Sequence, residues 1–278
     1  MVAGGFGTRR MFSKHKLGVI GAGNMGEALI RGALSAGLLQ PAGIVAADPR
    51  FERLQELESA LGIATTTDNN AVLADCNLIL IAVKPQVLEA LWSECAFADH
   101  HLIFSVVAGA TTDAIEAGAA KPLAVIRVMP NTPALVGQGM SVFCRGRHAG
   151  DEHAELATAL LSSVGQCNEV PEQWLDPATA VSGSGPAYVF LLAEAMQAGA
   201  ESLGLPADVS AELIQQTLVG AAALLQQSDL PASALRQRVT SPGGTTAAAI
   251  SVLEDGRFVE LIEAALHAAR QRAGELGS

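Results

Sequence analysis

The sequence is poor in aromatic residues, cysteine and basic residues. Aromatic side chains make up 4% of the chain, and its four cysteines include no CxxC pair. This spacing argues against a zinc site and a disulfide framework, and it is typical of free thiols in a reducing compartment such as the cytoplasm. Lysine and arginine number 17 against 28 acidic residues, for a net charge of −11. Such a surface argues against nucleic acid as a partner.

Several sequence features of membrane proteins and hydrolases are also missing. No apolar run approaches the ~18 residues that a membrane span requires, although the mean hydropathy is positive. There is no GxSxG nucleophile elbow, no HExxH pair and no GxxxxGK[ST] loop. The six histidines fall near charged residues in expected loops or on helix surfaces. We expect them to be exposed, and none is placed as a general base.

Residues 1–16 are basic, contain no acidic residue and have no apolar core segment. This composition excludes a secretory signal, whereas an Arg-rich, acid-poor segment leaves an organellar transit peptide open. We favour a disordered extension, a vector-derived segment or an upstream start, with Met11 as the alternative initiator.

The alternation of short apolar runs with helical stretches predicts two domains. Half of the 278 residues are apolar, enough for a sizeable core. Before residue 170 the expected strands are Leu17–Ile20, Ile44–Ala47, Leu78–Val83, Leu102–Val107, Ala124–Met129 and an edge strand at Cys167–Val170; the helices are Gly23–Ala36, Arg50–Leu61 and 151–161. Continuous apolar strands between helices indicate a parallel sheet covered on both faces. Later helices are expected at Val181–Gly199, Ala207–Gln227, Thr246–Glu254 and Arg257–Leu276. We therefore predict an α/β Rossmann-type domain over 17–170 and an all-α domain over 171–278.

The motif Gly21-x-Gly23-x-x-Gly26 lies directly between the first strand and the first helix of this pattern. Gly21 permits the tight turn, Gly23 lets the backbone approach a pyrophosphate, and Gly26 lets the helix pack on the strand. Unpaired N–H groups and the helix dipole favour an anion at this position. The context predicts a nicotinamide dinucleotide site rather than an ordinary glycine-rich turn.

Asp48 follows the second strand, 22 positions after Gly26. An acidic residue at about this distance ordinarily binds the ribose hydroxyls of NAD and repels a 2′-phosphate. Arg50, two residues later, could instead pair with that phosphate. NAD and NADP therefore both stay open as the cofactor.

Three further loops end strands of the expected sheet, where ligands of doubly wound sheets bind. Val83-Lys84-Pro85 makes Lys84 either a cofactor contact or a solvated lysine. The other two loops are Ala108-Gly109-Ala110 and Met129-Pro130-Asn131-Thr132-Pro133, and the two prolines stiffen the latter.

Two glycine-rich loops precede helices of the second domain. They are Ser182-Gly183-Ser184-Gly185-Pro186 and Thr240-Ser241-Pro242-Gly243-Gly244-Thr245-Thr246, with Thr245 or Thr246 expected as N-cap. Free N–H groups and hydroxyls at such positions suit a carboxylate. The alternative is that both loops are only capped helix starts.

At these motifs the chain resembles the pyrroline-5-carboxylate reductase family over residues 17–275. The matching stretches are GAGNMG (Gly21–Gly26), AVKP (Ala82–Pro85), RVMPNTPALV (Arg127–Val136), SGSGPAY (Ser182–Tyr188) and SPGGTT (Ser241–Thr246). The resemblance implies reduction of the C=N bond of 1-pyrroline-5-carboxylate to L-proline with NADPH or NADH. It also implies a homodimer through the helical domain, which assembles further into a ring such as a decamer.

The resemblance also assigns roles to residues. Thr246 is the implied proton donor to the ring nitrogen. The implied substrate ligands are Glu172, Ser241, Gly244, Thr245 and Thr246. The residue patterns above and the resemblance, which adds Asn69 and Val106–Ala108, together give the expected cofactor contacts: Ile20, Gly21, Gly23, Asn24, Met25, Gly26, Asp48, Arg50, Asn69, Ala82, Val83, Lys84, Pro85, Val106, Val107 and Ala108. Asp48 departs from the family pattern, because many members carry a small hydroxyl residue there.

Two other functions are alternatives for a chain with a Rossmann-type domain. A β-hydroxyacid dehydrogenase would carry a catalytic lysine on the first long helix of the second domain, but Ala187–Gly199 has none, and Lys121 is the only lysine after position 100. A non-catalytic NAD(P)-sensing module would have no use for the SGSGPAY and SPGGTT loops.

Overall fold

The computed structural model describes residues 7–276 and divides the chain into two units. The first unit comprises Met1–Ser184 and Ala269–Ser278, and the second comprises Gly185–Ala268. The sequence placed the division near residue 170. Residues 171–184 stay with the first unit because side chains of its sheet, described below, hold them.

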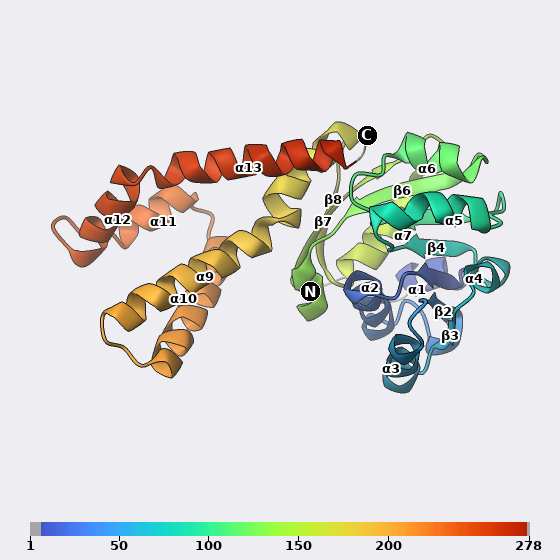
Figure 1. Ribbon diagram of the computed structural model, residues 1–278, viewed down its shortest axis with the longest axis horizontal. Helices are drawn as coiled ribbons and strands as arrows, with labels where there is room; N and C mark the ends of the chain where they lie inside the picture. The colour runs from blue at the N-terminus through green and yellow to red at the C-terminus, as the bar shows by residue number, and fades with distance from the viewer. Residues whose placement is uncertain (1–6, 277–278) are drawn as a thin grey trace. The chain divides into compact units, whose positions relative to one another are not determined.

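One sheet of eight strands forms the first unit (Figure 1). Its order is β3-β2-β1-β4-β5-β6-β7-β8, parallel from β3 to β6, with β7 antiparallel to β6 and β8 parallel to β7. The strands are β1 (Leu17–Ile20), β2 (Ile44–Ala47), β3 (Ala64–Thr66), β4 (Leu78–Ile81), β5 (Leu102–Ser105), β6 (Ala124–Met129), β7 (Gly139–Arg145) and β8 (Gly165–Glu169). The order reverses between β1 and β4, which is where doubly wound sheets bind nucleotides.

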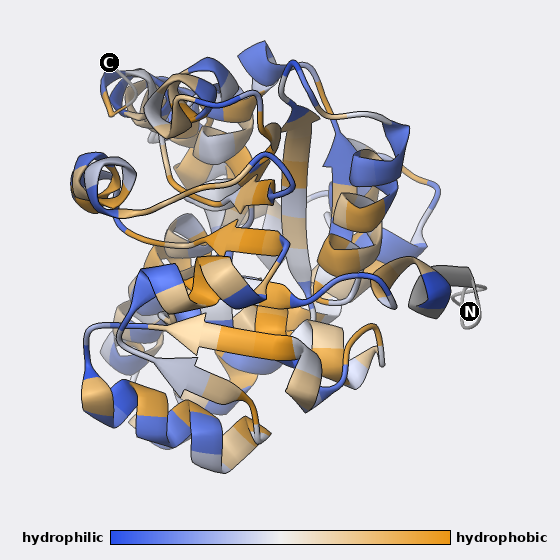
Figure 2. Cartoon of the chain, turned by 90° about the vertical axis from the view of Figure 1, so that its right-hand side faces the viewer, coloured by the Kyte–Doolittle hydropathy of each residue, from blue (hydrophilic) through white to orange (hydrophobic). Residues whose placement is uncertain are grey.

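The expected strands all appear, and the Rossmann-type fold is confirmed. Two strands were not predicted. β3 has only three residues, and β7 interrupts its apolar residues with Gly139 and Ser141. In β1, β2, β4 and β5 every residue is buried, and Figure 2 shows strands of the sheet that are mostly orange, the colour of hydrophobic residues. Burial of branched apolar residues on both faces stabilises the parallel sheet.

Helices cover the sheet and connect its strands. The α-helices are α1 (Gly7–Phe12), α2 (Asn24–Ser35), α3 (Phe51–Leu61), α4 (Asn69–Asp75), α5 (Leu88–Glu94), α6 (Thr112–Ala119), α7 (Asp151–Ser162) and α8 (Leu175–Ala178). Shorter turns are η1 (Pro41–Gly43), η2 (Pro85–Val87), η3 (Thr132–Val136), η4 (Glu172–Trp174) and the π-helical η5 (Thr179–Gly183).

The N-terminal segment corrects one expectation. Residues 7–16 are not a disordered extension, because α1 packs near α7 and the Phe12 side chain is buried in the main core. A phenyl ring this deeply buried stabilises the fold. Residues 1–6 lie outside the described part of the chain.

His101 corrects a second expectation, since it is buried rather than exposed. Its Nδ1 accepts a hydrogen bond from Ala98 N at 3.0 Å, and its Nε2 lies 3.0 Å from the carbonyl of Leu73. The ring immediately precedes β5, so it shares the burial of that strand, and these partners satisfy both nitrogens.

Long helices make up the second unit. They are α9 (Gly185–Ser202), α10 (Ala207–Gln227), α11 (Ala232–Arg238), α12 (Thr245–Asp255) and α13 (Phe258–Glu275), whose end from Ala269 onward belongs to the first unit. α9 and α10 form a hairpin joined by a short turn (Figure 1). Between them these five helices bury few side chains, and many large apolar residues stay exposed. Among residues 7–276, no helix combines the length and apolar character needed to cross a membrane.

Candidate active site

The turn between β1 and α2 is built around its glycines. Gly21 has φ +94°, and an added Cβ would lie 2.7 Å from the Ala82 carbonyl oxygen. At Gly26 an added Cβ would lie 2.6 Å from the Gly21 oxygen, so this glycine lets α2 pack against the turn. Gly23 differs, because a Cβ there would meet no atom within 4 Å. The space over Gly23 is open and fits a pyrophosphate.

The N-terminus of α2 faces this space without a side-chain cap. Gly23 is the N-cap, so the backbone N–H groups of Asn24, Met25 and Gly26 have no partner within the helix. The turn itself is held at Ala22, whose N–H donates to Asp48 Oδ2 at 3.2 Å and whose carbonyl accepts from Arg53 Nε at 2.8 Å. These two hydrogen bonds fix the backbone of Ala22, and the free N–H groups at the start of α2 are therefore held in one geometry.

Asp48 is buried and belongs to this bracing. Besides Ala22 N–H, its carboxylate accepts from Arg50 N at 3.0 Å, Arg50 Nε at 2.8 Å and Arg50 Nη2 at 3.0 Å. Burial disfavours its charged form, but the hydrogen bonds from Arg50 and Ala22 outweigh burial and hold the pKa of Asp48 below its ordinary value. Arg50 therefore neutralises the acid that would repel a 2′-phosphate, while its own side chain stays largely exposed.

The remaining expected cofactor residues lie along the same edge of the sheet. Ala82 N–H donates to the Ile20 carbonyl at 2.8 Å, and Val106 N–H donates to the Ile81 carbonyl at 3.0 Å. The hydrogen bonding between neighbouring strands therefore continues into the loops that follow them. These bonds bring Ala82–Pro85 and Val106–Ala108 beside the glycine turn. Asn69 starts α4 after β3, at that edge. The Lys84 side chain is exposed and makes no hydrogen bond or ion pair with residues 7–276, while its carbonyl accepts from Val87 N–H at 2.9 Å.

Glu172 is bound on both carboxylate oxygens by other residues of the first unit. Its Oε1 accepts from Thr112 N at 2.8 Å and lies 3.2 Å from Arg127 Nη1, and its Oε2 accepts from Thr112 Oγ1 at 2.7 Å. Arg127, itself buried in β6, also donates to Asp176 Oδ1 at 2.9 Å. A substrate contact by Glu172 would therefore have to share oxygens that Thr112 and Arg127 already use.

The SPGGTT loop starts α12 in the second unit. Gly244, not Thr245 or Thr246, is the N-cap, and no side chain caps the helix. Gly244 N–H donates to the Ser241 carbonyl at 3.0 Å, and an added Cβ at Gly244 would lie 2.5 Å from Ser241 Oγ. The first-turn N–H groups of Thr245 and Thr246 are left without helical partners, and the half-buried Thr246 hydroxyl bonds no described residue. This turn can bind a carboxylate.

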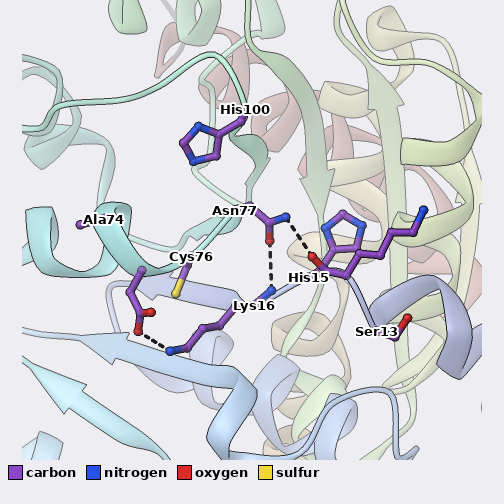
Figure 3. Close-up of a pocket in the computed structure, with 9 residues that line it drawn as sticks. Ser13, His15, Lys16, Ala74, Cys76, Asn77 and His100 are labelled. Atoms are coloured by element: carbon purple, nitrogen blue, oxygen red, sulfur yellow. Dashed lines mark hydrogen bonds and ion pairs between the residues drawn. The ribbon is translucent and has the colours of Figure 1, made fainter.

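A polar pocket of about 340 Å³ lies at the opposite edge of the sheet (Figure 3). It is lined by Ser13–Lys16, Ala74–Asn77 and His100. Lys16 precedes β1 and Asn77 precedes β4, so the pocket is at the amino ends of the strands, away from the glycine turn. Among residues 7–276 no group of three or more His, Cys, Asp or Glu could hold a metal ion.

Three residues that hold the segment around Glu172 and Ser182 had no role predicted from the sequence, namely Arg127, Asn131 and Asp176. Arg127 carried a usable signal, because a charge within the apolar run AVIRVM must find buried partners. The residues near Arg127 in the sequence do not indicate which acidic side chains pair with it.

The strand order, the open glycine turn and the Asp48–Arg50 pair define a dinucleotide-binding oxidoreductase of the Rossmann class. Residues 16–109 match the family model described as NADP oxidoreductase, coenzyme F420-dependent. Residues 172–276 match the model described as pyrroline-5-carboxylate reductase dimerisation.

The chain belongs to the pyrroline-5-carboxylate reductase family. It is 40% identical over 268 residues to pyrroline-5-carboxylate reductase 3 of Rattus norvegicus, covering 96% of this chain and 97% of the relative. The pyrroline-5-carboxylate reductase of Pseudomonas aeruginosa is 40% identical, covering 95% and 97%. Among solved structures, the enzyme of Coxiella burnetii has a TM-score of 0.85 at 35% identity, covering 95% and 99%. The NADP-bound pyrroline carboxylate reductase of Plasmodium falciparum has a TM-score of 0.87 at 29% identity, covering 95% and 98%.

Proposed function

We propose that this chain reduces the C=N bond of 1-pyrroline-5-carboxylate to give L-proline, the last step of proline biosynthesis, with NADPH or NADH as donor. The observation that carries the proposal is the uncapped first turn of α12. It offers N–H groups and a free Thr246 hydroxyl to a small carboxylate in a chain whose β1–α2 turn fits a dinucleotide.

In the proposed reaction the imine carbon gains a hydride and the ring nitrogen gains a proton. The reduced nicotinamide supplies the hydride when it is bound. Gly21–Gly26 would hold the pyrophosphate, Asp48 and Arg50 the adenosine ribose or its phosphate, and Asn69, Ala82–Pro85 and Val106–Ala108 would line the rest. Ser241, Gly244, Thr245 and Thr246 would hold the substrate carboxylate and orient the ring.

Thr246 would donate a hydrogen bond to the ring nitrogen, where negative charge develops as the hydride arrives. The hydroxyl is a weak acid, so its contribution as a donor is to stabilise the charge that develops on nitrogen, with water as the proton source. Where the imine is protonated beforehand, the Thr246 hydroxyl oxygen would instead accept a hydrogen bond from the ring N–H.

The exposed apolar residues of the second unit support a homo-oligomer. Phe190, Leu191, Val219, Val252 and Val259 are each more than 60% exposed, and exposed apolar surface on this scale is ordinarily covered by a partner. We propose a dimer through these helices that assembles further into a ring such as a decamer. Light scattering of the purified chain tests this, and a monomer at micromolar concentration would contradict it.

The four free cysteines support a reducing compartment, and we propose the cytoplasm.

Loss of NAD(P)H absorbance that depends on pyrroline-5-carboxylate tests the activity. Protein that binds cofactor but turns over none of this substrate would refute the proposed function. Thr246→Ala is expected to lower kcat by at least about tenfold. The matched control is Thr217→Ala, which removes an exposed α10 hydroxyl bonded only to its own helix. Unimpaired turnover of Thr246→Ala would remove the hydrogen-bond role alone.

A further inference from the structure

Asn131 connects two backbone segments that are far apart in the sequence. It lies between β6 and η3 and is 9% exposed. Its Nδ2 donates to the Ser182 carbonyl at 3.0 Å, and its Oδ1 accepts from Met140 N at 2.9 Å. Ser182 belongs to η5 and Met140 to β7, so one side chain ties the SGSG turn to the sheet.

The Ser182 carbonyl needs this donor because the helix cannot supply one. In an α-helix the carbonyl of residue 182 would accept from the N–H of residue 186, but Pro186 has no N–H. The backbone instead forms a π-helical turn closed by Ser184 N–H on the Thr179 carbonyl at 2.8 Å. The Ser182 carbonyl is partly buried, and a carbonyl shielded from water without a donor is costly. π-helical turns also recur at functional sites.

The same loop touches the turn at a second point. An added Cβ at Gly183 would lie 2.6 Å from Met129 Cε, so the end of β6 packs directly against the turn. The stretch from Met129 to Asn131 thus fixes the backbone of Ser182–Ser184 by one hydrogen bond and one close contact, just before α9 begins.

We propose that Asn131 is a positioning residue for the reductase reaction. Its amide holds the Ser182–Ser184 turn in its π-helical conformation, so that the turn and the start of α9 keep one fixed backbone geometry during turnover. This inference rests on the proposed function, because it assigns the SGSG turn to the site of that reaction. A misplacement of about 1 Å near reacting groups costs on the order of 100-fold in rate.

Asn131→Asp tests the proposal with almost no change in shape. The carboxylate still accepts from Met140 N–H but cannot donate to the Ser182 carbonyl. We expect kcat to fall at least tenfold, with KM for NADPH and NADPH binding within twofold of the wild type, because the glycine turn is untouched.

Asn77→Asp is the matched control. Asn77 Oδ1 accepts from Lys16 N at 3.0 Å and its Nδ2 donates to the Lys14 carbonyl at 3.2 Å, the same pattern at the opposite sheet edge (Figure 3). We expect it to lose less thermal stability than Asn131→Asp, because the lost hydrogen bond to Lys14 is exposed, while kcat stays within twofold of the wild type.

Hydrogen exchange supplies a readout that is independent of turnover. In Asn131→Asp, amides of residues 179–188 should exchange faster, and those of β1 and β4 should not. A kcat within twofold of the wild type, an equal kcat loss in both variants, or unchanged exchange over 179–188 would overturn the proposal. Should Asn131→Asp fail to bind NADPH, Asn131→Ala, which adds no charge, is judged by the same criteria. A wild-type chain without turnover refutes the proposed function instead, and exchange over 179–188 then still decides whether Asn131 anchors the turn.

Discussion

Replacing Glu172 by Gln separates two roles for this residue, direct binding of substrate and support of the sheet-domain loops. In the structure its two oxygens accept from Thr112 N and Oγ1 and lie against Arg127 Nη1. Gln keeps the length and one acceptor oxygen but removes the charge that pairs with Arg127. The support role therefore predicts a loss of stability, and the substrate role predicts a rise in KM for pyrroline-5-carboxylate.

The expected loss of stability follows from the exposure of the group. A hydrogen bond to a charged group contributes about 1.5–3 kcal/mol when buried. The Glu172 side chain is 33% exposed, so solvent screening reduces this to about 1–2 kcal/mol. For a domain of this size, that corresponds to a melting temperature lower by about 2–8 °C.

Calorimetric melting and steady-state kinetics on the same preparations measure both effects. Glu169→Gln is the control, because Glu169, three residues before Glu172, makes an exposed ion pair with Arg145 at 2.6 Å. We expect Glu169→Gln to melt within about 2 °C of the wild type. An unchanged melting temperature in Glu172→Gln, together with a KM for substrate raised tenfold, would refute the support role and show that Glu172 acts on the substrate.

Three further predictions follow from individual contacts. Arg50→Ala should lower kcat/KM for NADPH at least fivefold and change that for NADH less than twofold, because it unmasks Asp48 beside the 2′ position; equal losses for both cofactors would exclude the 2′-phosphate role. Burial raises the pKa of both Cys76 and Cys144 to about 12, so only about one thiol in 10⁴ is ionised at pH 8. A thiol reagent should modify both far more slowly in the native protein than in urea, and equal rates would contradict their burial. Burial also lowers the pKa of His101 below 6.5, so unfolded protein binds more protons and stability should fall as the pH drops below about 6.5. Urea unfolding between pH 5 and 8 measures this, and a His101→Gln variant with the same pH slope would show that another group is responsible.

Elements of the fold that depend on neighbouring residues could be predicted from the amino-acid sequence. The run LGVI followed by GAGNMG combines strand propensity, a glycine that tolerates positive φ and a helix start within ten residues, and the structure forms each element where it was expected. The sequence pattern did not predict β3, because a three-residue strand is too short to show a hydrophobic periodicity. It did not predict β7, because Gly139 and Ser141 interrupt the apolar residues of that strand. His101 was misjudged because its polar neighbours in sequence say nothing about the strand that buries it.

Contacts between side chains that are distant in the sequence could be found only in the folded chain. Glu172 finds Thr112 and Arg127, and Asn131 finds Ser182, across separations of 45 to 60 residues. Propensity and periodicity act over one or two turns of chain, whereas these contacts depend on strand order and on how closely the loops pack at one sheet edge. The local sequence is enough to predict that Arg127 needs an acidic partner, and that the Ser182 carbonyl receives no hydrogen bond from Pro186, which has no N–H. Only the folded chain shows that Glu172 and Asp176 supply the acid, and that Asn131 supplies the missing donor.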